Sequence, residues 1–265
     1  MAELAVRGAT LHVQRLGEGA SDAGGAPPVV FLHGLVMDNL SSWYFSVAPA
    51  VASRRAVVLY DLRGHGRSSA PAEGHGLDEH VADLTALLDA LAVTGPVELV
   101  GNSFGGLLAL AFALAHPARV ARIALVDALL PEPGWGAAMA RTLSLEGPDA
   151  EAKIAASFAD WLGRHSERKR NRLADQARRL VKQTSLLADL AASRSWEDRE
   201  LAAVACPVLA LYGAESDQRD RGERLARALP DCRLELWPGC THSILWQETA
   251  RLRDALVAWT SAPTG

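Results

Sequence analysis

Short apolar runs that alternate with helix-like segments are the feature that most constrains how this chain can fold. The runs at 28–34 and 55–61 are almost entirely apolar, which is typical of strands buried on both faces of a sheet. Comparable runs follow at 97–100, 120–126 and 207–212. Because helical patterns separate these runs, we expect the α/β class, with a mostly parallel sheet flanked by helices.

The remaining segments complete the alternation. Residues 2–16 alternate in the manner of two strands joined at Gly8, which predicts a hairpin at the start of the chain. Asp78 is the expected N-cap of a helix that ends at Gly95-Pro96. Further helices are expected at 40–52, 105–116, 221–229 and 244–259, and a further strand is expected at 233–237.

Residues 130–201 depart from this pattern. The stretch is helical in periodicity, rich in charge and contains tryptophans, and it has no convincing strand. We therefore expect a core domain formed by 1–129 and 202–265, with a helical insertion at 130–201.

Composition limits the partners of the protein. The 265 residues are 49% hydrophobic and 22% charged with a net charge of −4, which predicts a globular protein that binds small molecules and no nucleic acid. No apolar stretch approaches the roughly 20 residues that span a bilayer, and a secretory signal is not recognisable. Three cysteines without tight spacing predict neither a disulfide framework nor a zinc cluster. We expect a cytoplasmic protein with no membrane partner, metal or cofactor.

A Gly-Asn-Ser-Phe-Gly sequence at 101–105 lies between an expected strand and an expected helix. G-x-S-x-G in that context is typical of a nucleophile elbow, so Ser103 is the expected nucleophile. Gly101 and Gly105 leave room for the strained turn that presents the hydroxyl. The backbone N–H of Phe104 can then stabilise a developing oxyanion at the helix N-terminus.

A serine nucleophile needs a histidine base that a carboxylate orients. In folds with this elbow both follow the serine along the chain, and His242 lies between the last expected strand and the last expected helix. Asp217, in the loop after the strand at 207–212, is the expected acid, with Glu215 close by. Asp127 is the alternative acid, because it ends the strand before the insertion.

The second oxyanion donor is expected at the end of the first buried strand. His33 and Gly34 follow that strand, so the backbone N–H of Leu35 is the candidate. We expect a structural role for His33. His65 and His75 match no common metal-binding spacing.

Together these motifs resemble the α/β-hydrolase superfamily over nearly the whole chain. They occur in the family's order at 31–34, 61–68, 101–106, 213–217 and 239–242. The resemblance implies an eight-stranded sheet with a helical cap after the sixth strand, and residues 130–201 fit that cap. It is strongest for small cofactor-free esterases, thioesterases and lactonases. Carbon-carbon bond hydrolases share an Asn before the serine, like Asn102, but usually carry a Gly-Pro-Gly that this chain lacks.

Aromatic and polar residues near these motifs are candidates to bind substrate. An apolar acyl group would suit tryptophan walls, although packing between helices is the simpler role for any single tryptophan. The polar candidates follow the expected oxyanion turn or precede the nucleophile. The candidates are Trp43, Trp135, Trp161, Trp196 and Trp246 among the aromatic residues and Asn39, Ser42 and Asn102 among the polar residues.

Basic residues crowd the expected cap. A solvated helix face is the ordinary meaning of such a run, and docking of an acyl carrier protein or the phosphates of a CoA thioester is the sharper hypothesis. The residues are Arg164, Arg168, Lys169, Arg170, Arg172, Arg178, Arg179 and Lys182.

The sequence thus predicts a cofactor-independent serine hydrolase that cleaves a small-molecule ester or thioester through an acyl-enzyme. Alternatives on the same residues are a carrier-linked thioesterase or cyclase, a carbon-carbon bond hydrolase and a lactonase. A ligand-binding protein with little turnover is the alternative of a different class.

Overall fold

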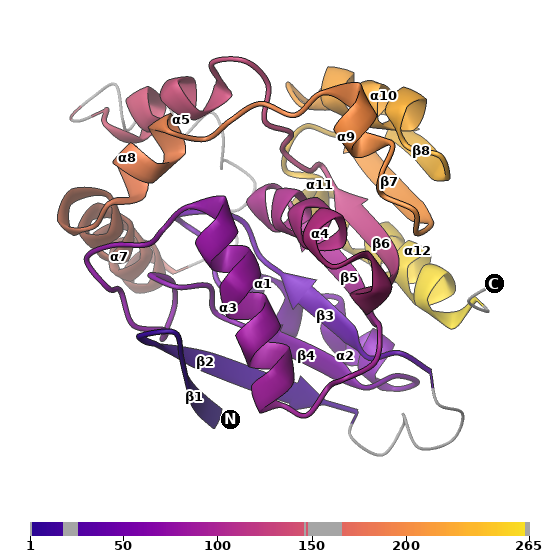
Figure 1. Ribbon diagram of the computed structural model, residues 1–265, viewed down its shortest axis with the longest axis horizontal. Coiled ribbons are helices and arrows are strands. Elements are labelled where there is room, and N and C mark those ends of the chain that lie inside the picture. The colour runs from indigo at the N-terminus through magenta and orange to yellow at the C-terminus, as the bar shows by residue number, and fades with distance from the viewer. Residues whose placement is uncertain (1, 18–25, 146, 148–165, 263–265) are drawn as a thin grey trace.

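The computed structural model describes residues 2–17, 26–145, 147 and 166–262. Its centre is an eight-stranded sheet in the order β1-β2-β4-β3-β5-β6-β7-β8 (Figure 1). The pairs β1/β2 and β2/β4 are antiparallel, and the other neighbours are parallel, which confirms the expected mostly parallel sheet. The strands are β1 Ala2–Val6, β2 Ala9–Leu16, β3 Val29–Leu32, β4 Val57–Tyr60, β5 Val97–Asn102, β6 Val120–Val126, β7 Val208–Gly213 and β8 Cys232–Trp237.

Helices cover both faces of the sheet. Residues of α3, α4 and α10 join one buried apolar cluster, and residues of α2, α11 and α12 join the other, so the two cores lie on opposite faces. The core helices are α1 Ser41–Tyr44, α2 Ala48–Ala52, α3 Leu77–Ala90, α4 Phe104–Ala115, α10 Arg219–Ala228, α11 Ile244–Gln247 and α12 Thr249–Ser261, with a 3-10 turn at Pro117–Arg119.

Two expected helices are each divided in the structure. The segment expected at 40–52 forms α1 and α2, and Pro49 lies in the first turn of α2, where its missing N–H is tolerated. The segment at 244–259 forms α11 and α12, which are separated at Glu248. Asp78 is not the N-cap of α3, since Gly76 takes that position and Asp78 lies in the first turn, where its charge favours the helix dipole.

Between β6 and β7 the described residues form four helices and no strand. These are α5 Trp135–Leu143, α7 Glu167–Gln183, α8 Leu186–Ala191 and α9 Asp198–Leu201. In Figure 1, α5, α7 and α8 lie together at one end of the molecule, beyond the N-terminus of α3. Among the described residues, no helix is long and apolar enough to cross a bilayer.

Candidate active site

Ser103 lies in the turn between β5 and α4, in a conformation that side chains rarely adopt. Its backbone φ is 51° and its ψ is −120°, a geometry that costs on the order of 1–3 kcal/mol and must be held by its surroundings. The Ser103 N–H donates to the carbonyl of Val126 at 3.0 Å, and the Ser103 carbonyl accepts from Gly106 and Leu129 at 3.1 Å each. The backbone of neighbouring elements therefore fixes the turn.

Two glycines permit the close packing around this turn. A Cβ on Gly101 would lie 2.3 Å from the carbonyl oxygen of Gly105, and a Cβ on Gly105 would lie 2.3 Å from that of Leu32. Both separations are far below van der Waals contact, so any side chain would push α4 away from β3 and β5. The steric role expected for both glycines agrees with this geometry.

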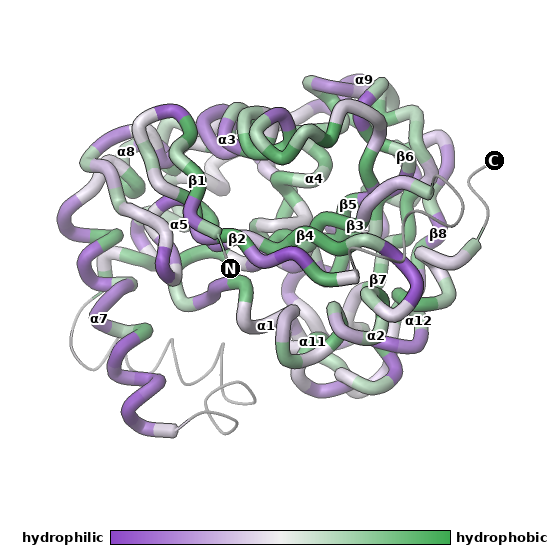
Figure 2. The backbone as a smooth tube through the Cα atoms, turned by 90° about the horizontal axis from the view of Figure 1, so that it is seen from below, coloured by the Kyte–Doolittle hydropathy of each residue, from purple (hydrophilic) through white to green (hydrophobic). Residues whose placement is uncertain are grey.

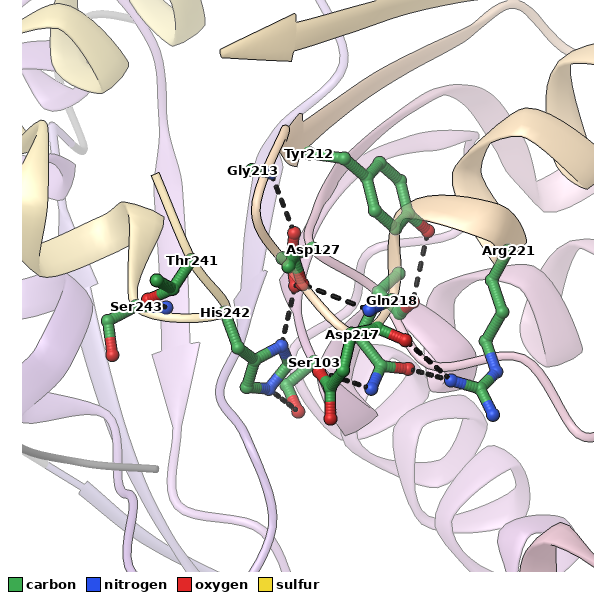
Figure 3. Close-up of polar contacts among 12 residues, drawn as sticks. Ser103, Asp127, Tyr212, Gly213, Asp217, Gln218, Arg221, Thr241, His242 and Ser243 are labelled. Carbon is green, nitrogen blue, oxygen red and sulfur yellow. Dashed lines mark hydrogen bonds and ion pairs between the residues drawn. The ribbon is translucent and has the colours of Figure 1, made fainter. Parts of the chain in front are cut away.

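His242, in the loop between β8 and α11, connects Ser103 to a carboxylate (Figure 3). Its Nε2 lies 3.1 Å from Ser103 Oγ, and its Nδ1 lies 2.6 Å from Asp127 Oδ2. With the proton on Nδ1, facing the carboxylate, Nε2 is free to accept the serine proton. The structure thus brings together the serine and the histidine that the motifs singled out.

Asp127 is the carboxylate that contacts His242. It follows β6 directly, with a φ of 47°, and is 1% exposed. Its Oδ1 accepts from the Gly213 N–H at 2.9 Å, and its Oδ2 also accepts from Ser216 Oγ. These donors hold the carboxylate toward the histidine.

The choice of Asp217 as the acid disagrees with the structure. Asp217 is exposed, and its carboxylate accepts from the side-chain amide of Gln218 at 2.8 Å. The turn after β7 directs Ser216 toward Asp127, whereas Asp217 is exposed to solvent. The alternative acid of the sequence analysis therefore occupies the position at His242.

The two expected oxyanion donors lie on either side of Ser103. A Cβ built on Gly34 would be 3.6 Å from Ser103 Cβ, so the turn that leads to Leu35 is beside the nucleophile. Phe104 begins α4 directly after it. Neither the Leu35 nor the Phe104 N–H donates to another group in the described part of the chain, which leaves both available to a ligand.

The polar substrate-binding candidates have partners of their own. Asn39 Oδ1 accepts from the Ser41 N–H at 2.9 Å, and Ser42 Oγ donates to Asp38. The Asn102 amide adjoins the Asp38 carboxylate, while its Oδ1 is buried without a partner in the described residues. Of this group, Asn102 alone keeps an unpaired polar atom next to Ser103.

The tryptophan candidates are mostly packing residues. Trp43 is fully buried, donates from Nε1 to the Leu32 carbonyl at 3.0 Å and packs against Phe31, so its observed contacts are those of a packing residue. Trp135 and Trp196 are buried in the cluster that contains α3 and α4. Trp161, like Arg164 in the basic run, lies outside the described residues.

Buried polar side chains hold the loop that leads from β3 to α1. His33 Nε2 accepts from the Leu62 N–H at 2.9 Å, and His65 Nε2 accepts from the Val36 N–H at 2.8 Å. Burial lowers the pKa of His33 to about 4 and that of His65 to about 3, so both rings are neutral. Asp61 accepts from the Leu40 N–H, and burial raises its pKa to about 6. His33 is thus structural, as expected. Asp61 and His65 belong to the motif at 61–68, but the motif alone did not indicate that they hold this loop.

Helix α7 reaches this loop from the other side. Its Leu173 and Ala177 form a small apolar cluster with Met37, against which Val36 and Trp246 pack. Trp246 is therefore the aromatic candidate that lies between α7 and the core. No group of three or more potential metal-ligating side chains is found in the described ranges.

Comparisons with known proteins agree with this architecture. A family model described as alpha/beta hydrolase fold matches residues 27–199. A pimeloyl-[acyl-carrier protein] methyl ester esterase of Chromobacterium violaceum is 31% identical over 88% of this chain and 91% of its own length. A non-heme chloroperoxidase of Streptomyces lividans is 38% identical, but the match covers 39% of this chain and only 37% of that protein.

A solved structure shows the same similarity in three dimensions. The crystal structure of an enol-lactonase from Burkholderia xenovorans superposes with a TM-score of 0.77 and 25% identity, over 98% of this chain and all of the other. The resemblance therefore covers nearly the whole chain.

Proposed function

Since the chain belongs to the α/β-hydrolase fold family and is a hydrolase of that fold, we propose that it cleaves carboxylic esters or thioesters through an acyl-enzyme on Ser103. The observation that carries this proposal is the hydrogen-bonded series Ser103, His242 and Asp127. No cofactor is needed for this chemistry.

The geometry assigns a role to each member of this triad. His242 Nε2 takes the proton of Ser103 Oγ as the oxygen attacks the substrate carbonyl, and the imidazolium then protonates the departing alcohol or thiol. Asp127 holds the Nδ1 proton and stabilises the positive ring. Water activated by His242 attacks the acyl-enzyme in the second half-reaction and releases the acid and free Ser103.

Backbone donors complete the site. The unpaired N–H groups of Leu35 and Phe104 would hold the oxyanion, and the N-terminal dipole of α4 adds to their effect. Residues 130–201 would form a cap over this site, with 1–129 and 202–265 as the core domain. The apolar contact of α7 with Met37 and Trp246 then favours an apolar acyl group.

A substrate panel with a matched serine control tests this function. Wild type, Ser103→Ala and Ser53→Ala are compared on p-nitrophenyl esters, acyl thioesters, lactones and vinylogous diketones; Ser53 is exposed at the end of α2. We expect ester or thioester turnover that Ser103→Ala lowers by about 10⁴-fold or more and Ser53→Ala leaves unchanged. Turnover of lactones or diketones only would show that the protein is a lactonase or a carbon-carbon bond hydrolase instead. No turnover would favour the ligand-binding alternative.

A carrier-linked acyl group is the second candidate, and the charge of α7 favours it. The helix carries seven basic and two acidic residues between Glu167 and Gln183, and Arg168 and Arg172 are exposed on it. The similar esterase acts on an acyl group held by an acyl carrier protein. An acidic carrier or a CoA phosphate would complement this surface.

Charge reversal separates this candidate from simple esterase activity. Arg168→Glu with Arg172→Glu should raise KM for acyl carrier protein or CoA thioesters and leave p-nitrophenyl esters unaffected, because only the carrier reaches α7. Arg253→Glu, on α12, is the control. Equal effects on both substrate types would exclude carrier docking on α7.

The cytoplasm is the proposed location. Cys206, Cys232 and Cys240 are all free thiols, as suits a reducing compartment. Fractionation of the source cells followed by immunodetection tests this, and recovery in an extracellular fraction would contradict it.

A further inference from the structure

The carboxylate of Asp38 lies between the loop after β3 and the elbow after β5. Its Oδ2 accepts from the Gly34 N–H at 2.8 Å, and its Oδ1 accepts from the Asn39 N–H at 2.8 Å and from Ser42 Oγ. The side-chain amide of Asn102 adjoins the same carboxylate, since a Cβ built on Gly34 would lie 3.1 Å from Asp38 Oδ2 and 3.6 Å from Asn102 Nδ2. The three hydrogen-bonded groups all donate, so the carboxylate acts only as an acceptor.

These contacts place Asp38 between the two oxyanion donors. Gly34 directly precedes Leu35, whose N–H is one donor. Asn102 precedes Ser103, and Phe104, the other donor, comes next. Asp38 therefore links the loop after β3 to the elbow after β5 through one rigid group.

Two other side chains hydrogen-bond the backbone of this loop, both from the segment after β4. His65 fixes the Val36 N–H, and Asp61 fixes the Leu40 N–H, and both belong to the segment after β4. Val36 has a φ of 68°, so the loop is strained and needs such anchors. Among the described side chains, Asp38 is the one that hydrogen-bonds this loop and also adjoins Asn102, the residue before the nucleophile.

We propose that Asp38 is a positioning residue that sets the separation of the Leu35 and Phe104 N–H groups and so tunes oxyanion stabilisation. This inference rests on the proposed function, because it assumes that both groups bind the oxyanion. Asp38 would not touch the reacting atoms, and its effect would be on the transition state more than on the bound substrate.

Asp38→Asn is the direct test, because it keeps the shape but replaces one acceptor oxygen with an amide that cannot accept. We expect kcat for a p-nitrophenyl ester to fall by about 10- to 100-fold, since small displacements of a preorganised group have effects of that size. KM should change by less than about threefold, as substrate binding does not depend on the oxyanion. Asp89→Asn, an exposed residue of α3, is the control.

A transition-state analogue distinguishes positioning from general damage. Phenylboronic acid forms a tetrahedral adduct on the serine oxygen, so its Kd should rise by the same factor by which kcat/KM falls. An unchanged kcat in folded Asp38→Asn, or a rise in KM at constant kcat, would overturn the proposal. If the wild-type protein shows no turnover that depends on Ser103, the proposed function itself is wrong. That outcome differs from an active wild type whose kcat is unaffected by Asp38→Asn, which would overturn only the role of Asp38.

Ser42→Ala keeps the test decisive if Asp38→Asn does not fold. It removes one hydrogen bond to the carboxylate and leaves the bonds from the Gly34 and Asn39 N–H groups in place. We expect a loss in kcat of about fivefold at constant KM, the effect of loosening one hydrogen bond. Wild-type kcat in Ser42→Ala would then overturn the proposal.

Discussion

The Ser103 elbow and helix α7 meet at the same loop but are held in different ways. The elbow is fixed by backbone hydrogen bonds from β6 and by glycine contacts with β3 and α4. Helix α7 buries only Leu173, Ala177 and Leu180 of its 17 residues, and Figure 2 shows it as a largely hydrophilic segment that extends from the body.

This difference indicates that the elbow serves the chemical step and that α7 serves the selection of substrates. Preorganised chemistry needs groups held within a fraction of an ångström, which strand ends and buried hydrogen bonds provide. Selection of substrates tolerates, and often requires, a less firmly packed element. We therefore expect changes in the core to affect turnover or stability strongly and changes on α7 to affect mainly which substrate is accepted.

The largest contrast is expected between the two carboxylates after β6 and β7. Asp127→Asn should lower kcat/KM by about 10⁴-fold, because the amide cannot hold the Nδ1 proton and the ring takes the wrong tautomer. Asp217→Asn should change kcat/KM by no more than about twofold, since Asp217 is exposed and its carboxylate contacts Gln218 instead of His242. Steady-state kinetics on a p-nitrophenyl ester measure both, and the opposite ranking would restore Asp217 as the acid.

Cavity-forming substitutions extend the comparison to stability. Leu107→Ala, in the fully buried part of α4, should lower the free energy of unfolding by about 2–5 kcal/mol. Leu173→Ala, on α7, should cost less than about 1 kcal/mol in global stability, because α7 can open locally without the core. Urea unfolding measures both values. A cost for Leu173→Ala equal to that of Leu107→Ala would show that α7 unfolds with the core.

Buried histidines near the elbow predict an acid-sensitive core. The pKa values of His33, His65 and His80 are depressed by burial, so below pH 6.5 the unfolded chain binds protons that the native protein does not. Stability should be full above pH 6.5 and fall as pH decreases toward 4, by about 1.4 kcal/mol per pH unit for each histidine. Asp61 acts in the opposite direction. Because its pKa is raised to about 6, the native protein binds one proton more at this residue than the unfolded chain does between pH 6 and the ordinary pKa of an aspartate.

Replacement of His80 tests how much one histidine contributes to the pH dependence of stability. Both ring nitrogens of His80 are buried without partners in the described residues, beside the Phe104 ring. His80→Phe should therefore reduce the slope of stability with pH by one proton while leaving stability at pH 7.5 nearly unchanged. Equal slopes in the variant and in wild type, measured by urea unfolding at pH 5–7, would be inconsistent with a neutral His80.

The smallest effect is expected from the exposed ion pair on α7. Arg178 and Asp175 are 3.1 Å apart with side chains 66% and 57% exposed, so Arg178→Ala should change the unfolding free energy by at most about 0.5 kcal/mol. Arg63→Ala is the buried counterpart, since Arg63 pairs with Asp83 at 2.7 Å, and it should cost about 3–5 kcal/mol. Thermal melting of the two variants compares these effects. Similar losses of stability in Arg178→Ala and Arg63→Ala would contradict the contrast between the core and α7.

The motifs predicted what depends on local sequence. Strand, turn and helix around Ser103 are encoded within nine residues, so the elbow could be located without a structure. The position of His242 followed from the order of elements. The choice between Asp127 and Asp217 depended on the direction of two short turns, and no periodicity encodes whether Ser216 or Asp217 points inward.

Tertiary packing explains the other departures. Trp43 looked like a pocket residue because it follows the oxyanion turn, but its ring fills the space beneath β3. Asp38 lies in a loop without a motif, and its importance becomes visible only when Gly34, Ser42 and Asn102 are seen around one carboxylate. Such many-partner groups are properties of the assembled fold.

Covalent labelling tests the central claim most directly. Incubation with a fluorophosphonate, followed by intact-mass and peptide mass spectrometry, should show one adduct located on Ser103, because only an activated serine reacts with such a probe. Ser103→Ala should give no adduct, and Asp127→Asn should label far more slowly than Asp217→Asn. A wild-type protein that stays unlabelled, or an adduct on another residue, would contradict the proposed mechanism.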